Sequence, residues 1–534
     1  MKTVLASTER GRPRPRVPAD IHAGLRAKAP ALLAMLIALL VTGCNVGPKY
    51  VRPPVTTPSA FKEGGPASTH STNLWQKAQP QDAVSRANWW KAFGDLQLNT
   101  LEDQVSISNQ NVAAALANFF AARAVVREAR AQLFPTLTMS PAVSESQFSS
   151  SGFQSRTAPG TTLPNGATIT SSSSSASGAS ITAYSLPFDA SWAPDLWGRV
   201  RNTIQANAAQ AQATAADLEN TRLTAQQDLA VDYFELRAQD ELQQLLNATV
   251  AAYRQSLELA EVRFQTGIAS QGDIVLAQTQ LATTEAQATG LAIQRAQFEH
   301  AIALLIGKPA SSFSIPVEPL RTNLPAVPVG LPSQLLERRP DIAAAERRVA
   351  AANAQIGVAR AAYFPNLTLS GSGGFQSSAI SSLLNFSSGF WAVGGSLAQT
   401  IFDAGLRRAT VEQFRANYQS AVAAYRQTVL TAFEQVENNL AALRILSQEV
   451  NQQEQAVRFS EQNLSLTVEL YKTGIYSYLN IITAQTTLLA NRQTLVNLRL
   501  QQLSSTVQLI GALGGGWDAA RLASQNREAP APSL

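Results

Sequence analysis

The residues that most often carry catalytic or metal chemistry are scarce in this sequence of 534 residues. It has three histidines, His22, His70 and His300, and one cysteine, Cys44. No histidine has a cysteine or a carboxylate cluster nearby at metal-ligand spacing. The glycine runs GSGG and GGG lack a following Lys-Ser and a strand-to-helix context, so they do not predict phosphate binding. We therefore expect no enzyme, no metal site and no cofactor.

Cys44 points to a different chemistry. Residues 1–43 begin with seven Lys and Arg residues against two acidic ones and continue with an apolar run of about a dozen residues, the order typical of an export signal. VTGC at residues 41–44 resembles the lipobox of bacterial lipoproteins. This resemblance implies cleavage before Cys44 and a covalent lipid, palmitate included, on Cys44; an ordinary buried cysteine is the alternative. Asn45 stands where Asp would resemble an inner-membrane retention signal, which implies delivery to the outer membrane.

The rest of the chain is electrically balanced. The net charge of +5 comes from the basic N-terminal segment, and from Cys44 onward positive and negative residues are equal in number. A balanced chain offers no basic surface for nucleic acid, which we do not expect as a partner. No later stretch is apolar and long enough to cross a membrane as a helix.

One turn occurs twice, and two long helical segments must position it. FQTGIASQGDIVLAQTQL starts at Phe264, and YKTGIYSYLNIITAQTTL starts 207 residues later at Tyr471. The segments before the turns, 199–266 and 406–473, contain no Gly and no Pro. At ~1.5 Å per residue each would form a helix of roughly 100 Å.

Shorter helices are expected around these rods. Two of them follow the turns, and two more could stack end to end with the first two to match the long helices. We expect them at residues 273–306, 477–510, 95–134 and 340–364. A plain antiparallel coiled-coil bundle is the alternative for the helices alone.

Two segments have a strand pattern instead. Phe-Pro opens each, at Phe134 and at Phe364, and apolar residues then alternate with polar ones until a glycine, Gly198 or Gly405, starts the next long helix. Four strands of about ten residues that are apolar on one side are typical of lipid-facing barrel strands, and an ordinary half-buried sheet is the alternative. One chain would leave two open edges, so a barrel needs several copies, and three copies give twelve strands.

Three stretches carry a family resemblance: LLERRPDIAAAERRVAAANAQIGVARAAYFPNLTLSG from Leu335, NWWKAFGDLQLNTL from Asn88 and PDLWGRVRNTIQAN from Pro194. They resemble the outer-membrane factor family, the TolC-type channels, in its NodT-like lipoprotein branch of tripartite drug efflux pumps. The resemblance implies a mixed α and β membrane protein in which a long α-helical periplasmic barrel continues a transmembrane β-barrel. Each chain of the homotrimer would supply four strands and two internal structural repeats.

The resemblance also implies a passive exit duct for small molecules such as drugs, and so a part in antibiotic resistance. It would sit lipid-anchored in the outer membrane, with a large periplasmic extension. The implied partners are a periplasmic adaptor (membrane fusion) protein, an inner-membrane transporter of RND type and outer-membrane lipid. Alternatives are the exit channel of a type I protein secretion system, a metal-ion efflux channel and a structural or adhesive surface coiled coil.

In this family the repeated turns form the periplasmic tips, where the channel closes and the adaptor docks. Gly267 and Gly474 suit tight turns with positive φ. Carboxylates with Arg or Tyr commonly gate the family; here Asp273 and Tyr471 match, and Tyr471 is expected to hydrogen-bond across the tip. An apolar constriction is the other expectation, and helix packing and helix N-capping by Asp273 are the alternatives. The candidate gate residues are Asp273, Tyr471, Ile475, Tyr476, Leu479 and Thr483, the last at a position where relatives often carry Asp.

The expected organisation follows from these patterns. A signal peptide occupies residues 1–43 and a lipid-anchored extended segment residues 44–87. The first repeat covers 88–307, with its β-hairpin at 135–195 and its tip near 267, and the second covers 332–513, with its β-hairpin at 365–403 and its tip near 474. A Pro-rich linker at 308–331 joins them, and 514–534 form a C-terminal tail.

Overall fold

The computed structural model describes residues 45–63, 86–147, 180–321, 323–325, 327 and 338–516. The expected signal, Cys44, most of the tail and part of the linker lie outside them. The chain divides into two compact units. The first consists of Met1–Pro48, Ala129–Ile204 and Ala354–Glu412, and the second of Lys49–Glu128, Gln205–Asn353 and Gln413–Leu534.

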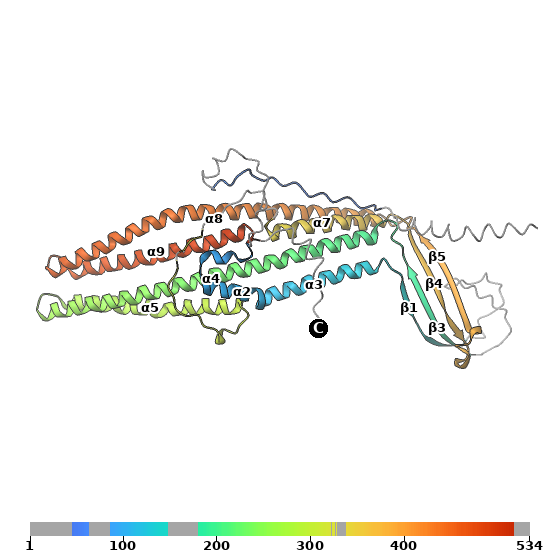
Figure 1. Ribbon diagram of the computed structural model, residues 1–534, viewed down its shortest axis with the longest axis horizontal. Coiled ribbons are helices and arrows are strands. Elements are labelled where there is room, and N and C mark those ends of the chain that lie inside the picture. The colour runs from blue at the N-terminus through green and yellow to red at the C-terminus, as the bar shows by residue number, and fades with distance from the viewer. Residues whose placement is uncertain are drawn as a thin grey trace, which may run out of the picture. The chain divides into compact units, whose positions relative to one another are not determined.

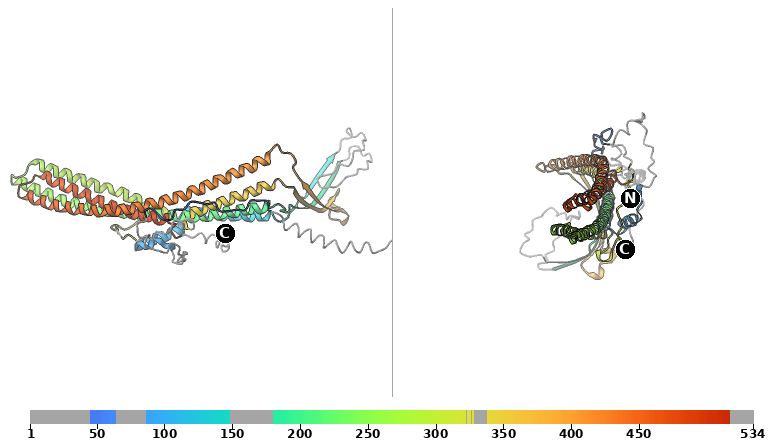
Figure 2. Two further views of the ribbon diagram at one scale, coloured as in Figure 1. Left: turned by 90° about the horizontal axis from the view of Figure 1, so that it is seen from above. Right: turned by 90° about the vertical axis from the view of Figure 1, so that its left-hand side faces the viewer.

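Two pairs of long helices run side by side in Figures 1 and 2. Helices α4 (Arg199–Gln265) and α8 (Leu406–Lys472) both have 67 residues, within one residue of their expected bounds. Helices α5 (Gln271–Leu305) and α9 (Tyr478–Ala512) both have 35 residues. No helix in the described part of the chain combines the length and apolar character needed to cross a membrane.

The expected single helix over 95–134 is wrong, because Asn109 divides it. Helix α2 (Leu96–Ser108) ends there and α3 (Gln110–Ala131) begins. Asn109 has extended backbone, and its Oδ1 accepts hydrogen bonds from the amides of Asn111 and Val112, which caps α3. Its Nδ2 donates to the carbonyl of Leu305 at 2.8 Å, so α3 starts where α5 ends.

The second half repeats this end-to-end contact with other residues. Helix α7 (Pro340–Ala361) has 22 residues, as α3 does. Arg339, just before α7, donates to the carbonyl of Ala512 at the end of α9, with an N···O distance of 3.0 Å. The expected stacking of short helices is therefore present in both halves.

One antiparallel sheet contains all the described strands, in the order β1-β3-β4-β5 with β2 also beside β3. The first expected strand is divided into β1 and β2, because Pro141 between them and Pro187 on β3 both lack an amide N–H. The other three expected strands are continuous. The bounds are Thr136–Met139 for β1, Ala142–Gln147 for β2, Ser180–Trp192 for β3, Asn366–Ser377 for β4 and Gly389–Ala398 for β5.

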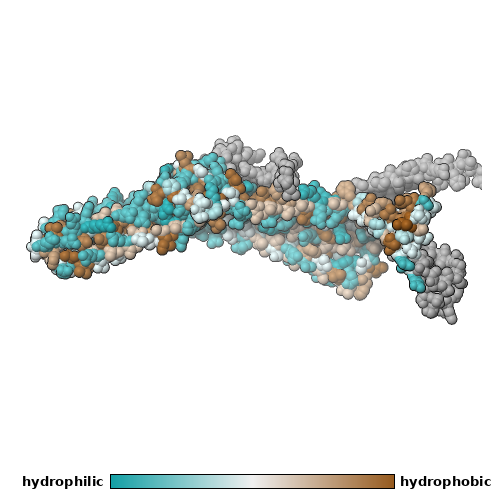
Figure 3. Space-filling model, turned by 90° about the horizontal axis from the view of Figure 1, so that it is seen from below, coloured by the Kyte–Doolittle hydropathy of each residue, from teal (hydrophilic) through white to brown (hydrophobic). Residues whose placement is uncertain are grey.

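The register gathers apolar side chains on one face of the sheet. Met139 pairs with Phe188, which pairs with Gly373, and Gly373 pairs with Trp391. The adjacent row on the opposite face contains Thr138, Asp189, Ser372 and Ala392. The apolar face is exposed in this chain, with Trp391 81% accessible, and Figure 3 shows hydrophobic surface over the strands.

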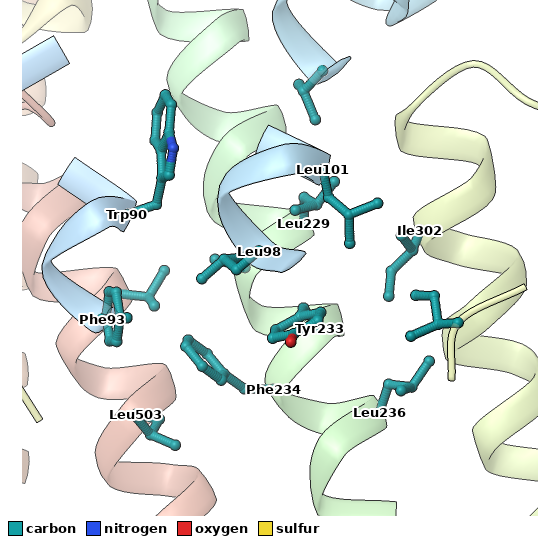
Figure 4. Packing of buried hydrophobic residues seen from close by; sticks show 14 of the residues in the cluster. Trp90, Phe93, Leu98, Leu101, Leu229, Tyr233, Phe234, Leu236, Ile302 and Leu503 are labelled. Carbon is teal, nitrogen blue, oxygen red and sulfur yellow. The ribbon is translucent and has the colours of Figure 1, made fainter. Parts of the chain in front are cut away.

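The main hydrophobic core lies in the second unit, where α2, α4, α5 and α9 meet (Figure 4). The Phe93 ring packs against the Phe234 ring at a tilt of 51°, with centroids 5.1 Å apart. Tyr233 is fully buried, and its hydroxyl donates to Asp95 Oδ2 at 2.8 Å. Because Asp95 also caps α2 through its other oxygen, one carboxylate joins the short helix to the long one.

A buried ion network holds the linker against this core. The Oδ1 atom of Asp240 accepts a bond from Arg295 at 2.7 Å, and its Oδ2 atom accepts from Arg237 at 3.2 Å and from the amide of Glu318 at 3.1 Å. The two arginines also donate to the carbonyls of Ile315 and Pro316. Asp240 therefore joins α4, α5 and the linker.

We predict that Asp240→Ala lowers the free energy of unfolding by about 3 kcal/mol, because it leaves the buried Arg237 with only the longer, 4.0 Å ion pair to the partly exposed Glu318. Thermal unfolding followed by circular dichroism measures the change. The control is Glu412→Ala, which removes an exposed ion pair with Arg408 and costs less than about 1 kcal/mol. Equal effects of the two substitutions would contradict the role given to Asp240.

Candidate functional site at the helical hairpin tips

The two turns have the same backbone geometry. Gly267 has φ of 73° and Gly474 of 82°, in the left-handed region where glycine is favoured. The amide after each glycine donates back into the last helical turn, from Ile268 to the Arg263 carbonyl and from Ile475 to the Leu470 carbonyl, both at 2.9 Å. These bonds satisfy carbonyls at the ends of α4 and α8.

The starts of the two return helices differ. Ser270 caps α5, and Asp273 completes a capping box by accepting a bond from the Ser270 amide. Asp273 is thus the third residue of α5 and not its N-cap, which corrects the expected alternative. At the start of α9, Ser477 makes no capping bond to the backbone, and its hydroxyl donates to Asn480 Oδ1 at 2.8 Å. The second tip therefore lacks the carboxylate of the first.

Arg263 joins the first hairpin to the second. Its Nη1 donates to the carbonyls of Tyr471 and Lys472, at 2.8 and 3.0 Å. Its guanidinium carbon also lies 4.4 Å from the centre of the Tyr471 ring, within the range of a cation–π interaction. A cation at the C-terminal end of α8 is favoured by the helix dipole as well.

Tyr471 and Tyr478 form a buried aromatic pair beside this arginine. Their ring centroids are 5.7 Å apart, and they pack with Ala260, Ala277 and Ile481. The expected hydrogen bond from the Tyr471 hydroxyl across the tip is wrong for the part of the chain that the structure describes, where this buried hydroxyl has no partner. The contact across the tip uses the ring and the backbone carbonyl instead.

Burial raises the pKa of both tyrosines, that of Tyr478 to about 12. The Arg263 guanidinium opposes the rise in the pKa of Tyr471, whereas the Asp273 charge adds to the rise at both rings. A phenol with a raised pKa stays neutral, so the pair is uncharged at any physiological pH. The tip contact should therefore not respond to pH in that range.

The other candidate gate residues are on the surface of this chain. Ile475 is 68% exposed and Leu479 58% exposed, and Tyr476 and Thr483 are exposed too. Packing within their own tip, the alternative explanation for Ile475 and Leu479, does not fit this exposure. The Thr483 hydroxyl bonds only to the Leu479 carbonyl one turn earlier among the described residues. The structure thus separates a buried group around Tyr471 from an exposed apolar group around Ile475.

Sequence reasoning missed Arg263 and Tyr478. Arg263 was recognisable as a basic residue in the last turn of α4, where side chains can donate to free carbonyls. Nothing in the sequence showed that it would reach the other hairpin. The tips contain no nucleophile with a neighbouring base, and the described residues include no group of three or more metal-ligating side chains. This arrangement can hold two hairpins together, but it has no evident chemistry of its own.

Comparisons with known proteins identify the family of the chain. The family model described as outer membrane efflux protein matches residues 101–308 and 331–515. The toluene efflux pump outer membrane protein TtgF of Pseudomonas putida is 30% identical over 487 residues, which cover 91% of this chain and 97% of that protein. The cation efflux system protein CusC of Escherichia coli is 30% identical over 491 residues, which cover 91% of this chain and 98% of that one. The solved outer-membrane channel OprN is similar at a TM-score of 0.77 and 26% identity, covering 89% of this chain and all of that chain.

The fold and these matches define a helix-rich, mixed α and β outer-membrane protein of an efflux system. The chain belongs to the outer membrane efflux protein family.

We predict that Arg263→Ala loosens the contact between the hairpins without unfolding the chain. Two charge-assisted hydrogen bonds and a cation–π contact are lost, so amide exchange at residues 471–475 should become at least about tenfold faster. Hydrogen exchange with mass spectrometry measures this. Arg254→Ala, which breaks an exposed pair with Glu285 within one hairpin, is the control and should leave that exchange unchanged. Unchanged exchange in Arg263→Ala would refute the contact.

Proposed function

We propose that the protein is the passive exit duct of a tripartite efflux system. Three copies would close one transmembrane β-barrel of twelve strands, and their long helices would form a periplasmic barrel that opens and closes at the hairpin tips. The observation that carries this proposal is the exposed apolar face of a sheet whose outer strands, β1 with β2 and β5, have no further partner among the described residues.

Inside a membrane, the sheet of one chain would be incomplete because both of its edges are open. Backbone groups at an open sheet edge cannot bond to water inside a bilayer, so each edge requires another strand. Each chain supplies four strand positions, because β1 and β2 lie along the same side of β3. Three copies give an even strand number within the range of outer-membrane barrels. The apolar side chains on one face of the sheet, among them Leu137, Trp391 and Leu397, would then face lipid.

The exposed apolar group at the second tip supports a dewetting gate. Ile475 and Leu479, with Tyr476, contribute large side chains that the described residues leave 41 to 68% exposed. In a closed ring of copies they would narrow the pore, and an apolar constriction can stop conduction without physical contact. The Arg263 contact would keep the two hairpins of each copy in the closed arrangement.

A periplasmic adaptor (membrane fusion) protein would open the gate. An inner-membrane transporter of RND type would drive the export. A bound partner shifts an equilibrium only by its differential affinity, so the adaptor must bind the open tips better than the closed ones. Two similar tips per chain would give a trimer six docking sites. This supports reading the two halves as internal structural repeats.

Relatives named for toluene, antibiotic and cation efflux are all 30% identical to this chain. Identity therefore does not choose among drugs, solvents and metal ions, and metal-ion efflux stays open beside small-molecule efflux. An exit channel for type I protein secretion is the remaining alternative.

We also propose a lipid on Cys44, which lies outside the described residues. The lipid would anchor the chain in the outer-membrane leaflet that faces the periplasm. The mass of the N-terminal peptide measures it, and an unmodified Cys44 in protein purified from membranes would refute it.

We predict that Leu479→Ser and Ile475→Ser each raise the resting conductance of the purified channel, because a polar side chain favours water in the constriction. Single-channel recordings in planar bilayers measure this. Ile293→Ser is the matched control, since Ile293 is equally exposed but lies on α5 away from the tips. Equal conductance in all variants would remove these residues from the gate.

Cells that lack this protein should accumulate more of a fluorescent efflux dye, and complementation should restore the lower level. This compares the same cells with and without the channel. No difference across several dyes, with expression confirmed, would favour protein secretion or a narrow-substrate pump over small-molecule efflux.

A further inference from the structure

The first residues after Cys44 fit into a small niche in the first unit. The Asn45 side chain accepts a hydrogen bond from Asn202 Nδ2 at 2.8 Å, and the same nitrogen donates to the Gly198 carbonyl at 2.7 Å. The amide of Val46 donates to the Trp197 carbonyl at 3.4 Å. Asn202 is only 2% exposed, so its carboxamide bonds to these protein groups and not to bulk water.

Three glycines leave the room for this pair. A Cβ at Gly357 would lie 2.7 Å from the Asn202 side chain, and a Cβ at Gly47 would lie 2.8 Å from it. A Cβ at Gly198 would come within 3.0 Å of Asn45 Oδ1. The first two distances are shorter than real Cβ contacts, and the third is tighter than nine in ten of them, so a larger residue at any of the three would push against one of the asparagines.

The described residues of the second half form no such niche. The offset of 207 residues matches Gly198 with Gly405 and Asn202 with Ala409. Gly357 is the eighteenth residue of α7, and the eighteenth residue of α3 is Arg127. A Cβ at Gly405 would meet nothing within 4 Å among the described residues. The junction between strand and helix therefore does not itself require the asparagine or the helical glycine.

The niche is also fixed to the sheet. Trp197 donates from its ring nitrogen to the carbonyl of Pro365 at 2.8 Å, and β4 starts at the next residue. The Trp197 ring stacks on Phe364 with centroids 4.8 Å apart. Cys44 precedes Asn45 directly, and consecutive Cα atoms are about 3.8 Å apart. A lipid on Cys44 would thus be attached one residue away from Asn45, which contacts the start of α4.

We propose that Asn202, Gly198 and Gly357 form a docking niche for the start of the mature chain, which holds the lipid-bearing end beside the ends of β3 and β4. This proposal rests on lipidation of Cys44. Docking would bring the acyl chains and the apolar face of the sheet to the membrane together, so the niche would speed insertion without contributing to the pore.

A nitroxide on Val46→Cys tests the docking in the full lipidated chain, where a lipid on Cys44 leaves the new cysteine as the only free thiol. We expect a slow label in the parent and a rotational correlation time at least about threefold shorter with Gly357→Ala or Asn202→Ala, because the segment loses its hydrogen bonds. Gly357→Ala also favours its helix by roughly 1 kcal/mol, so loss of helix would not explain the result. Asn417→Ala, an exposed Asn on α8, is the control. Equal mobility in all four proteins would overturn the docking.

Insertion and lipidation are measured on the same proteins. The niche variants should carry the same N-terminal lipid mass as the parent but should acquire a heat-resistant, membrane-inserted form several-fold more slowly. Normal insertion with a mobile label would overturn the positioning role. A parent without lipid would refute the lipidation proposal alone, because Cys44→Ser then removes the second thiol and the label on Val46→Cys still reports whether the segment is docked.

Discussion

Backbone hydrogen bonding at the edges of the sheet is the constraint on which the account depends. In the described residues β3 and β4 each have strands on both sides, whereas β1, β2 and β5 each have one. Water can satisfy such edges in solution, but lipid cannot. A sheet with one apolar face and two open edges is therefore stable in a membrane only when it is joined to other strands. The proposed trimer, the barrel and the duct all follow from this requirement.

The helices impose a second constraint, which is length. Each half contains one helix of 67 residues and two helices of 35 and 22 residues that meet end to end. The two joints use different side chains, Asn109 in the first half and Arg339 in the second, to satisfy the carbonyls at a helix end. Different residues at the same joint indicate that the joint itself is required. The halves differ at other positions, since the offset of 207 matches Asp273 with Asn480 and Asn202 with Ala409.

The sequence predicted the helices well because their signals are local. A run of 68 residues without Gly or Pro and a glycine at each turn set the ends of α4 and α8 to within one residue. The break at Asn109 was missed, because its side chain caps α3 and also donates to the carbonyl of Leu305, almost 200 residues away, and the sequence does not show this second contact. The division of β1 from β2 was missed because it depends on Pro187 across the sheet as well as on Pro141 in the strand itself.

The candidate site was predicted in position but not in its contacts. The repeated turn located the tips, and Tyr471 lies in the contact between the two hairpins. Its partner is Arg263, which the sequence places 208 residues earlier and which only the packing of the hairpins brings near. Exposure also cannot be read from residue type, so only the structure separated the exposed Ile475 and Leu479 from the buried Ile481.

Native mass spectrometry of the protein purified in detergent tests the central claim most directly. The account predicts a complex of three copies, since four strand positions per chain then close a barrel of twelve. A protein that inserts into membranes and conducts as a single chain, or as a complex of another copy number, would contradict it.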